Sequence, residues 1–173
     1  HNVSFISIVG IGGLGKTTLA QHVYNDEQVK AFFELKMWVS VSEVFSVKTV
    51  AEKIIECAAG RKPDNFPYEV LQNRVHQELD QKKFLLVLDD VWNVENEEWS
   101  NLKSLLMGGS KGSKVLITTR TRYVAKITST VSPYFLKGLS VEKSWSLLKR
   151  IAFNKGEDSN PDRLFKIIYN LAK

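Results

Sequence analysis

The stretch GIGGLGKT, which begins at Gly10, matches two phosphate-binding patterns at once. Gly10, Gly12 and Gly15 form G-x-G-x-x-G, a pattern typical of loops that bind dinucleotides. Gly10, Gly15, Lys16 and Thr17 form G-x-x-x-x-G-K-T, the pattern of loops that bind the phosphates of ATP or GTP. The two patterns predict different ligands, so further residues must decide between them.

Lys16 and Thr17 favour the nucleoside phosphate. A phosphate loop needs glycines whose backbone N–H groups face the phosphates, a lysine for the β and γ phosphates and a hydroxyl ligand for Mg²⁺. A dinucleotide loop requires neither side chain, but it needs an acidic residue about 20 positions further on. Glu43 is the candidate for that acid, although it lies somewhat late.

An aspartate pair follows the apolar run 84–88. Asp89 would stand at the end of a buried strand, where its carboxylate can hold the Mg²⁺ bound by Thr17. Asp90 could polarise an attacking water as a general base. Together with Lys16, which would meet the β and γ phosphates, it is a candidate catalytic residue. Two aspartates that end a strand are often merely solvated, but the phosphate loop upstream favours a joint nucleotide site over a dinucleotide site.

Arg120 directly follows the apolar run 115–119. It would emerge beside Asp89 at the same edge of the sheet, where a guanidinium can pair with γ-phosphate oxygens. The spacing alone allows a surface arginine at a strand end equally well.

The elements that would position these residues alternate along the chain. Apolar runs predict strands at residues 3–9, 35–41, 84–88, 115–119 and 134–136. Helical periodicity predicts helices to about residue 26, from the cap Ser46 onward, through Leu71, Val75 and Leu79, through Trp99, Leu102 and Leu106, and at 123–127. This alternation predicts an α/β fold of the P-loop NTPase class, a five-stranded parallel sheet with helices on both faces. Its ligand would lie at the carboxyl ends of the strands.

Beyond residue 138 only helical patterns remain, one from Ser140 onward and one over 164–171. We therefore expect residues 1–137 to form a P-loop nucleotide-binding domain and residues 138–173 to begin a helical subdomain. The chain starts directly in a strand and ends within a helical pattern, which indicates a segment of a longer protein.

Composition limits the other classes of function. The net charge of +5 permits nucleotide, nucleic acid or an acidic protein surface as partner, but the lysines and arginines are scattered, which disfavours nucleic acid. No stretch approaches the ~20 apolar residues of a membrane span. The single cysteine, Cys57, fits a reducing compartment, and its apolar surroundings predict a buried side chain. Trp92 is likewise expected in the core.

Five ordered motifs resemble those of one family. They are GIGGLGKTTLA (10–20), FELKMWVSVSEVF (33–45), KKFLLVLDDVWN (82–93), GSKVLITTR (112–120) and YFLKGLSVEKSWSLLKRIAF (134–153). In this order and spacing they resemble the NB-ARC nucleotide-binding domain of plant NLR disease-resistance proteins. Trp92, which closes LDDVW, and the form of the second motif are similar to the coiled-coil branch and unlike the branch with a TIR domain.

The resemblance implies an ATP/ADP switch of plant defence and the hypersensitive response. An ADP-bound form would be closed, exchange for ATP would accompany activation and oligomerisation of the full-length protein, and Mg²⁺-dependent hydrolysis would be slow. Asp90 would be the hydrolytic carboxylate and Arg120 the γ-phosphate sensor, with Thr17 and Asp89 on Mg²⁺. The residues expected to bind the nucleotide are Gly10, Gly12, Gly13, Leu14, Gly15, Lys16, Thr17, Thr18 and Arg120.

The resemblance also implies a cytoplasmic receptor whose coiled-coil, remaining ARC and leucine-rich repeat domains are partners of this one. The family's Gly-Leu-Pro-Leu and Met-His-Asp motifs do not occur in these 173 residues. We therefore expect this chain to bind nucleotide weakly and to discriminate little between adenine and guanine. The alternative function is a turnover ATPase of the same class, coupled to work on nucleic acid or protein.

Overall fold

Five apolar segments form a parallel sheet in this computed structural model, which describes residues 2–41 and 44–152. The strands are β1 (Val3–Val9), β2 (Leu35–Ser40), β3 (Phe84–Val91), β4 (Ser113–Thr119) and β5 (Tyr134–Phe135). They lie in the order β2-β3-β4-β1-β5, and every neighbouring pair is parallel. The predicted sheet is confirmed, and the largest change is in β3, which continues through the aspartate pair.

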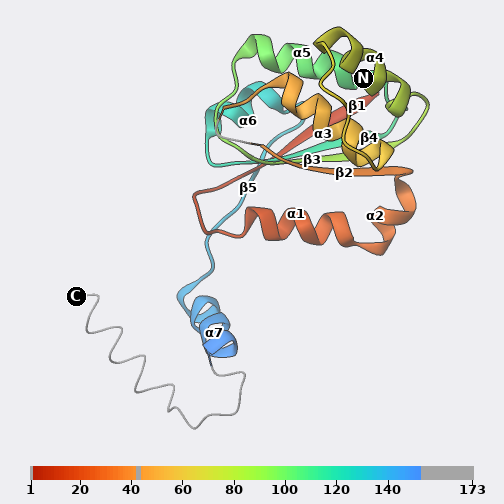
Figure 1. The fold of residues 1–173 in the computed structure, drawn as a ribbon. Coiled ribbons are helices and arrows are strands. Elements are labelled where there is room, and N and C mark those ends of the chain that lie inside the picture. The colour runs from red at the N-terminus through yellow and green to blue at the C-terminus, as the bar shows by residue number, and fades with distance from the viewer. Residues whose placement is uncertain (1, 42–43, 153–173) are drawn as a thin grey trace. The chain divides into compact units, whose positions relative to one another are not determined.

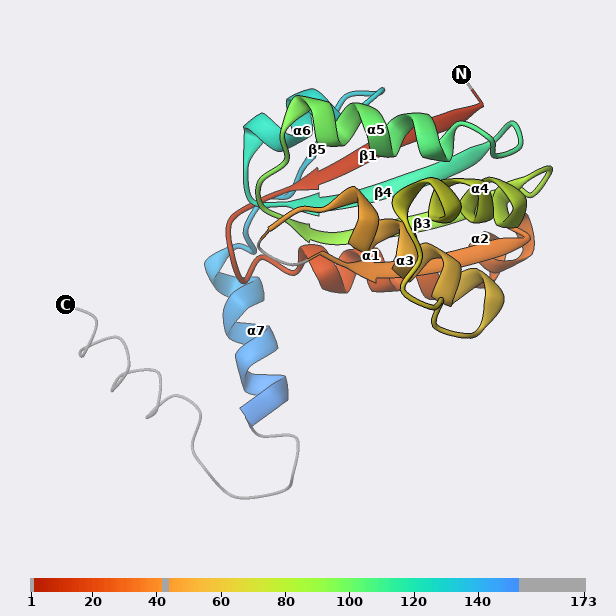
Figure 2. The same ribbon diagram turned by 45° about the horizontal axis from the view of Figure 1, so that its top comes forward.

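Helices cover both faces of the sheet (Figure 1 and Figure 2). One face carries α1 (Lys16–Asn25) and α2 (Glu27–Phe32), and the other carries α3 (Val47–Ala59), α4 (Tyr68–Leu79), α5 (Asn96–Leu106) and α6 (Arg122–Thr128). The helix α2 was not predicted. Asp26, the expected end of the first helix, instead begins the second by accepting hydrogen bonds from the N–H groups of Gln28 and Val29.

Two apolar cores hold these layers together. The larger core lies between the sheet and α3–α6, where Phe5 and Trp99 meet edge to face with ring centroids 5.3 Å apart. The smaller core joins the sheet to α1 through Ala20, Val87 and Leu116. The central strands β1, β3 and β4 are thus largely buried on both faces, which fixes the positions of their carboxyl ends.

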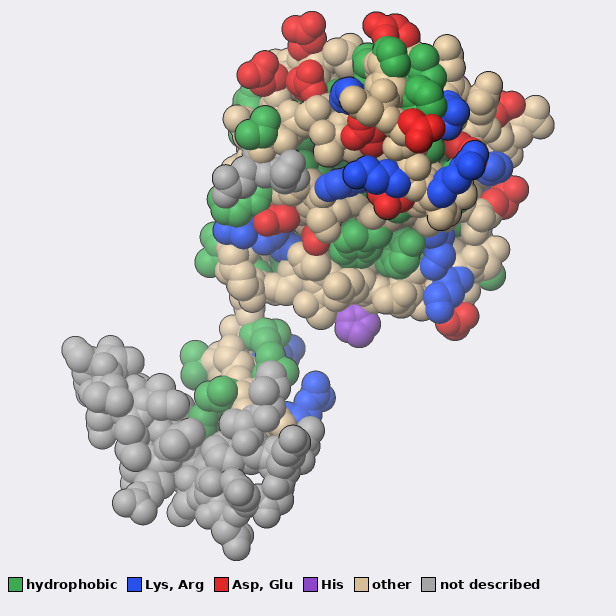
Figure 3. All heavy atoms as spheres, viewed as in Figure 1, with side chains coloured by type: hydrophobic (Ala, Val, Ile, Leu, Met, Phe, Trp, Pro, Cys, Tyr) green, Lys and Arg blue, Asp and Glu red, His purple; other side chains and the backbone are tan. Residues whose placement is uncertain are grey.

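Two apolar side chains lie outside the core, against expectation. Cys57 is exposed, because the buried stripe of α3 continues from Ile55 to Ala58 and leaves Cys57 at its side. Trp92 is 41% exposed and directly follows Val91, the last residue of β3. On the face of the larger unit drawn in Figure 3, lysine and arginine side chains lie among aspartates and glutamates.

The chain divides into two compact units, residues 1–137 and 138–173. Within the described part of the second unit, α7 (Val141–Ala152) forms where helical periodicity predicts it. The helix predicted over 164–171 lies outside the described residues, so the assignment of this unit to a helical subdomain stays a prediction. None of the helices within 2–41 and 44–152 combines the length and the apolar character needed to cross a membrane.

Gly109 offers a test of the larger core. A methyl group at this position would overlap the ring of Phe84, which is fully buried. We expect Gly109→Ala to lower the free energy of unfolding by about 1–3 kcal/mol, because a packed core accommodates added volume only through strain. At Gly108 the nearest atom to such a methyl group is Cδ2 of His76 at 3.9 Å. Urea denaturation should therefore find Gly108→Ala close to wild type, and equal losses in both variants would contradict this packing.

Candidate phosphate-binding site

The candidate site lies at the carboxyl ends of three neighbouring strands. Because β4 lies between β1 and β3, the loop after β1, the aspartate pair and Arg120 come together there. A cavity of about 280 Å³ opens at this edge. Its lining residues are Gly12, Gly13, Gly15, Lys16, Thr17, Thr18, Asp90 and Arg120. Of the predicted site residues, Gly10, Leu14 and Asp89 do not line the cavity, and Glu43 lies outside the described residues.

The glycine loop takes a conformation that other residues adopt at a cost. Gly13 and Gly15 have φ angles of 77° and 89°, in the left-handed region, and Gly15 is the N-cap of α1. The loop therefore leads directly into a helix N-terminus, where unpaired N–H groups and the helix dipole favour an anion. Gly10 lies outside the cavity. A methyl group there would stand 3.0 Å from Cδ1 of Leu14, so the loop packs closely at this position.

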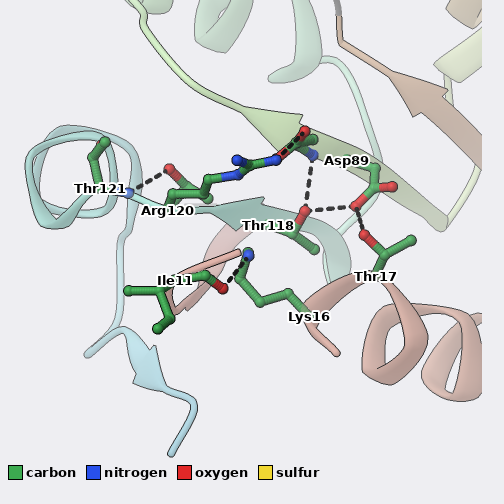
Figure 4. Close-up of polar contacts among 9 residues, drawn as sticks. Ile11, Lys16, Thr17, Asp89, Thr118, Arg120 and Thr121 are labelled. Atoms are coloured by element: carbon green, nitrogen blue, oxygen red, sulfur yellow. Dashed lines mark hydrogen bonds and ion pairs between the residues drawn. The ribbon is translucent and has the colours of Figure 1, made fainter. Parts of the chain in front are cut away.

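Lys16 is folded over this loop. Its side chain is only 6% exposed, and its ammonium donates a hydrogen bond of 3.1 Å to the carbonyl oxygen of Ile11 (Figure 4). The first residue of α1 thus turns its charge back across the loop toward the cavity, where an ammonium can meet phosphate oxygens.

Asp89 is held by two hydroxyl groups from different elements. Its Oδ1 accepts hydrogen bonds from Thr17 Oγ1 at 3.0 Å and from Thr118 Oγ1 at 2.6 Å (Figure 4). A carboxylate and a threonine hydroxyl are oxygen donors of the kind that Mg²⁺ prefers, and Mg²⁺ takes few protein ligands when phosphates and water complete its shell. The pair fits such an ion. No group of three or more His, Cys, Asp or Glu side chains with metal-binding geometry occurs within the described ranges.

Thr118 is a site residue that the sequence analysis missed. Its fully buried hydroxyl donates to Asp89 and also accepts a hydrogen bond of 2.8 Å from the backbone N–H of Asp90. Asp90 has a φ of 60° at a register shift between Leu88 and Val91, so it leaves the ladder and turns toward the cavity. The available signal was the pair of threonines, Thr118 and Thr119, directly before the arginine that follows the fourth predicted strand.

Arg120 reaches across the cavity to Asp90, with 40% of its side chain exposed. Its Nη2 lies 3.4 Å from Oδ2 of Asp90, and its guanidinium carbon lies 3.9 Å from the centre of the Trp92 ring. A methyl group added at Gly12 would stand 3.6 Å from Nη1. Arg120 therefore lies between the glycine loop and the end of β3.

Removal of the Thr118 hydroxyl should loosen both aspartates. Thr118→Val keeps the shape of the side chain but leaves the N–H of Asp90 without its acceptor, and such losses cost about 1–3 kcal/mol. We expect the free energy of unfolding in urea to fall by this amount. Thr118→Ser retains the hydroxyl and should lose clearly less. Equal losses of stability in Thr118→Ser and Thr118→Val would show that the hydrogen bonds of the hydroxyl do not account for the loss.

Together, the parallel sheet, the glycine loop at a helix N-terminus and the adjoining aspartates define an α/β domain of the P-loop NTPase class. Comparison with protein families finds that the NB-ARC domain model matches residues 1–158. The chain belongs to the NB-ARC family, as its motifs predicted.

Similar proteins with curated names include disease resistance proteins of plants. The chain is 43% identical over 166 residues to disease resistance protein RGA2 of Solanum bulbocastanum, an alignment that covers 94% of this chain and 17% of the relative. It is 36% identical over 170 residues to disease resistance protein RPP13 of Arabidopsis thaliana, covering 94% and 20%. The chain thus spans a fifth or less of the length of these relatives.

Two solved structures share the fold at low sequence identity. One is a signal transduction ATPase with numerous domains and a tetratricopeptide repeat sensor from Pyrococcus horikoshii, with a TM-score of 0.53, 23% identity and coverage of 95% of this chain and 25% of that one. The other is a chain from the structure of Drosophila ORC bound to DNA, with a TM-score of 0.63, 13% identity and coverage of 90% and 41%. Both likenesses concern the fold alone.

Proposed function

We propose that this chain is the nucleotide-binding part of an ATP/ADP switch in a cytoplasmic plant immune receptor of the coiled-coil type. The observation that carries the proposal is the meeting of Lys16, Thr17, Asp90 and Arg120 around one cavity at the glycine loop. The names of the similar proteins support a role in disease resistance. Coiled-coil, further ARC and leucine-rich repeat domains of the same receptor would be its partners, and the full-length protein would oligomerise on activation.

In this proposal the loop binds the phosphates of ATP or ADP. Backbone N–H groups from Gly13 to Thr18 surround the phosphates, and Lys16 exchanges its bond to Ile11 for one to a β or γ oxygen. Thr17 and Asp89 would hold Mg²⁺, which when bound supplies positive charge against the phosphates. Asp90 lies at the cavity wall, where its carboxylate can orient a water and accept its proton.

The switch follows from the two partners available to Arg120. Without a γ-phosphate, Arg120 pairs with Asp90, and both side chains are about 40% exposed, so the pair is worth little, about 0–1 kcal/mol. A γ-phosphate offers a bidentate, charge-assisted partner instead. ATP and ADP therefore leave Arg120 in different arrangements, and a ligand that favours one arrangement shifts the population toward it.

Arg120→Ala tests this assignment directly. We expect binding of Mg²⁺ with a non-hydrolysable ATP analogue to weaken about 10- to 100-fold, the range for loss of a hydrogen bond to a charged group. Binding of Mg-ADP should stay within about twofold, because ADP offers no γ oxygen. Arg122→Ala, at the first residue of α6 and stacked on Phe135, is the matched control. Equal losses for both nucleotides would show that Arg120 does not sense the γ-phosphate.

Slow hydrolysis belongs to the same proposal, and a turnover ATPase is the competing function. The resemblance to NB-ARC domains implies this slow rate, and the exposed Asp90–Arg120 pair does not, because it is too weak to hold the carboxylate once a γ-phosphate takes Arg120. With the full-length receptor and saturating Mg-ATP, we expect fewer turnovers than about one per second, the lower end of ordinary enzymes. A faster rate would favour the turnover ATPase.

A further inference from the structure

The indole of Trp92 is an exposed aromatic surface beside the cavity at the glycine loop. It is 41% exposed and lies directly after β3, outside both cores. Its ring lies against the guanidinium of Arg120, with 3.9 Å between the guanidinium carbon and the ring centre. Trp92 belongs to neither core, and among the described residues the ring contact that it makes is with Arg120.

The guanidinium of Arg120 is used on two different sides. Trp92 contacts its flat face by a cation–π interaction, whereas Asp90 contacts the N–H edge through Nη2 at 3.4 Å. These contacts do not compete for the same atoms. An anion can therefore replace Asp90 at the edge while the stack on Trp92 remains.

Stacking also restricts a side chain that would otherwise be mobile. Arginine has many rotamers, and ordering them on binding weakens the interaction that follows. A guanidinium already fixed in one plane over Gly12, where Nη1 lies 3.6 Å from an added methyl position, avoids most of that cost. The plane of the guanidinium is thus set before any phosphate arrives.

We infer that Trp92 is a positioning residue for γ-phosphate recognition. It holds the plane of Arg120 above the glycine loop, while Asp90 and the γ-phosphate exchange at the N–H edge. This inference rests on the proposed function, because it assigns Trp92 a part in the same nucleotide-sensing step. It takes the residue out of the core-packing role that the sequence suggested.

The test compares ATP analogue and ADP binding in Trp92 variants. Trp92→Leu should weaken binding of Mg²⁺ with a non-hydrolysable ATP analogue about two- to fivefold, the effect of losing an exposed cation–π contact, and leave Mg-ADP binding unchanged. Trp92→Phe retains an aromatic face and should restore most of the affinity. In an Arg120→Ala background, Trp92→Leu should have no further effect. Because Trp92 is exposed, these variants should melt close to wild type.

A readout without nucleotide tests the stack itself. The δ-methylene protons of Arg120 should be shifted upfield in the wild-type spectrum by the indole ring current, and this shift should vanish in Trp92→Leu. If Arg120→Ala leaves ATP binding unchanged, the proposed function fails and this inference falls with it. If Arg120→Ala weakens ATP binding but Trp92→Leu does not, or weakens ADP binding equally, only the inference is overturned.

Discussion

The variant Lys16→Ala should lose the stabilisation that Mg-ADP and Mg-ATP give to the wild-type chain. A ligand that binds only the native state stabilises it by RT ln(1 + [L]/Kd), about 2.7 kcal/mol at 100 times Kd. Lys16 and Arg120 are the cationic residues that line the cavity, and Lys16 is the one at the helix N-terminus. Without its ammonium, the negative charge of the β and γ phosphates has no cationic partner on the loop.

Thermal melting with and without nucleotide measures this effect. We expect a clear rise of the Tm in wild type and no rise in Lys16→Ala at the same ligand concentration. Lys30→Ala is the control, because Lys30 lies on α2 and pairs with Glu27 away from the loop. An undiminished Tm shift in Lys16→Ala would refute the assignment of the loop as the phosphate site.

The second large effect should come from Asp89→Asn. The amide oxygen can still accept hydrogen bonds from Thr17 and Thr118, so the fold is preserved, but the negative charge is gone. Mg²⁺ should then strengthen ATP binding far less than in wild type. We expect a loss of about 10- to 100-fold in the affinity for the Mg²⁺ complex, as when a metal site loses a supporting carboxylate.

Titrations of the ATP analogue with Mg²⁺ and with a chelator separate the contribution of Mg²⁺ to the affinity from that of phosphate binding. Affinity in the chelator should be similar in wild type and Asp89→Asn. Asp90→Asn is the matched control. Asparagine tolerates the left-handed backbone at φ 60°, and its backbone N–H can still donate a hydrogen bond to Thr118 Oγ1. A variant Asp89→Asn with wild-type Mg²⁺ dependence would place the metal elsewhere.

The sheet and the loop were predictable because their signals are local. Strands covered on both faces are nearly continuous apolar runs, as in Val3–Val9, and the phosphate loop needs glycine, lysine and threonine within one stretch. The Ser46 cap of α3 was equally local, and the structure confirms it through the hydrogen bond from the N–H of Thr49. In each case the residues that matter are close in the sequence.

Two features of the site that were missed depend on the register between strands. Thr118 reaches both aspartates because β4 pairs with β3 at one particular register, which is interrupted between Leu88 and Val91. Neither the pairing nor the interruption leaves a mark in the sequence. The stack of Trp92 on Arg120 has the same origin, since it joins the ends of two neighbouring strands.

In the proposed function, the glycine loop holds a nucleoside di- or triphosphate and not a dinucleotide. An NMR titration of the isotope-labelled chain with Mg-ADP tests it most directly, because each backbone amide reports its own surroundings. We predict that the largest shifts occur at the amides of Gly13, Gly15, Lys16 and Thr17, and that NAD⁺ at the same concentration leaves these amides nearly unchanged. Shifts of these amides with NAD⁺ but not with Mg-ADP, or shifts with Mg-ADP confined to residues away from the loop, would contradict the account.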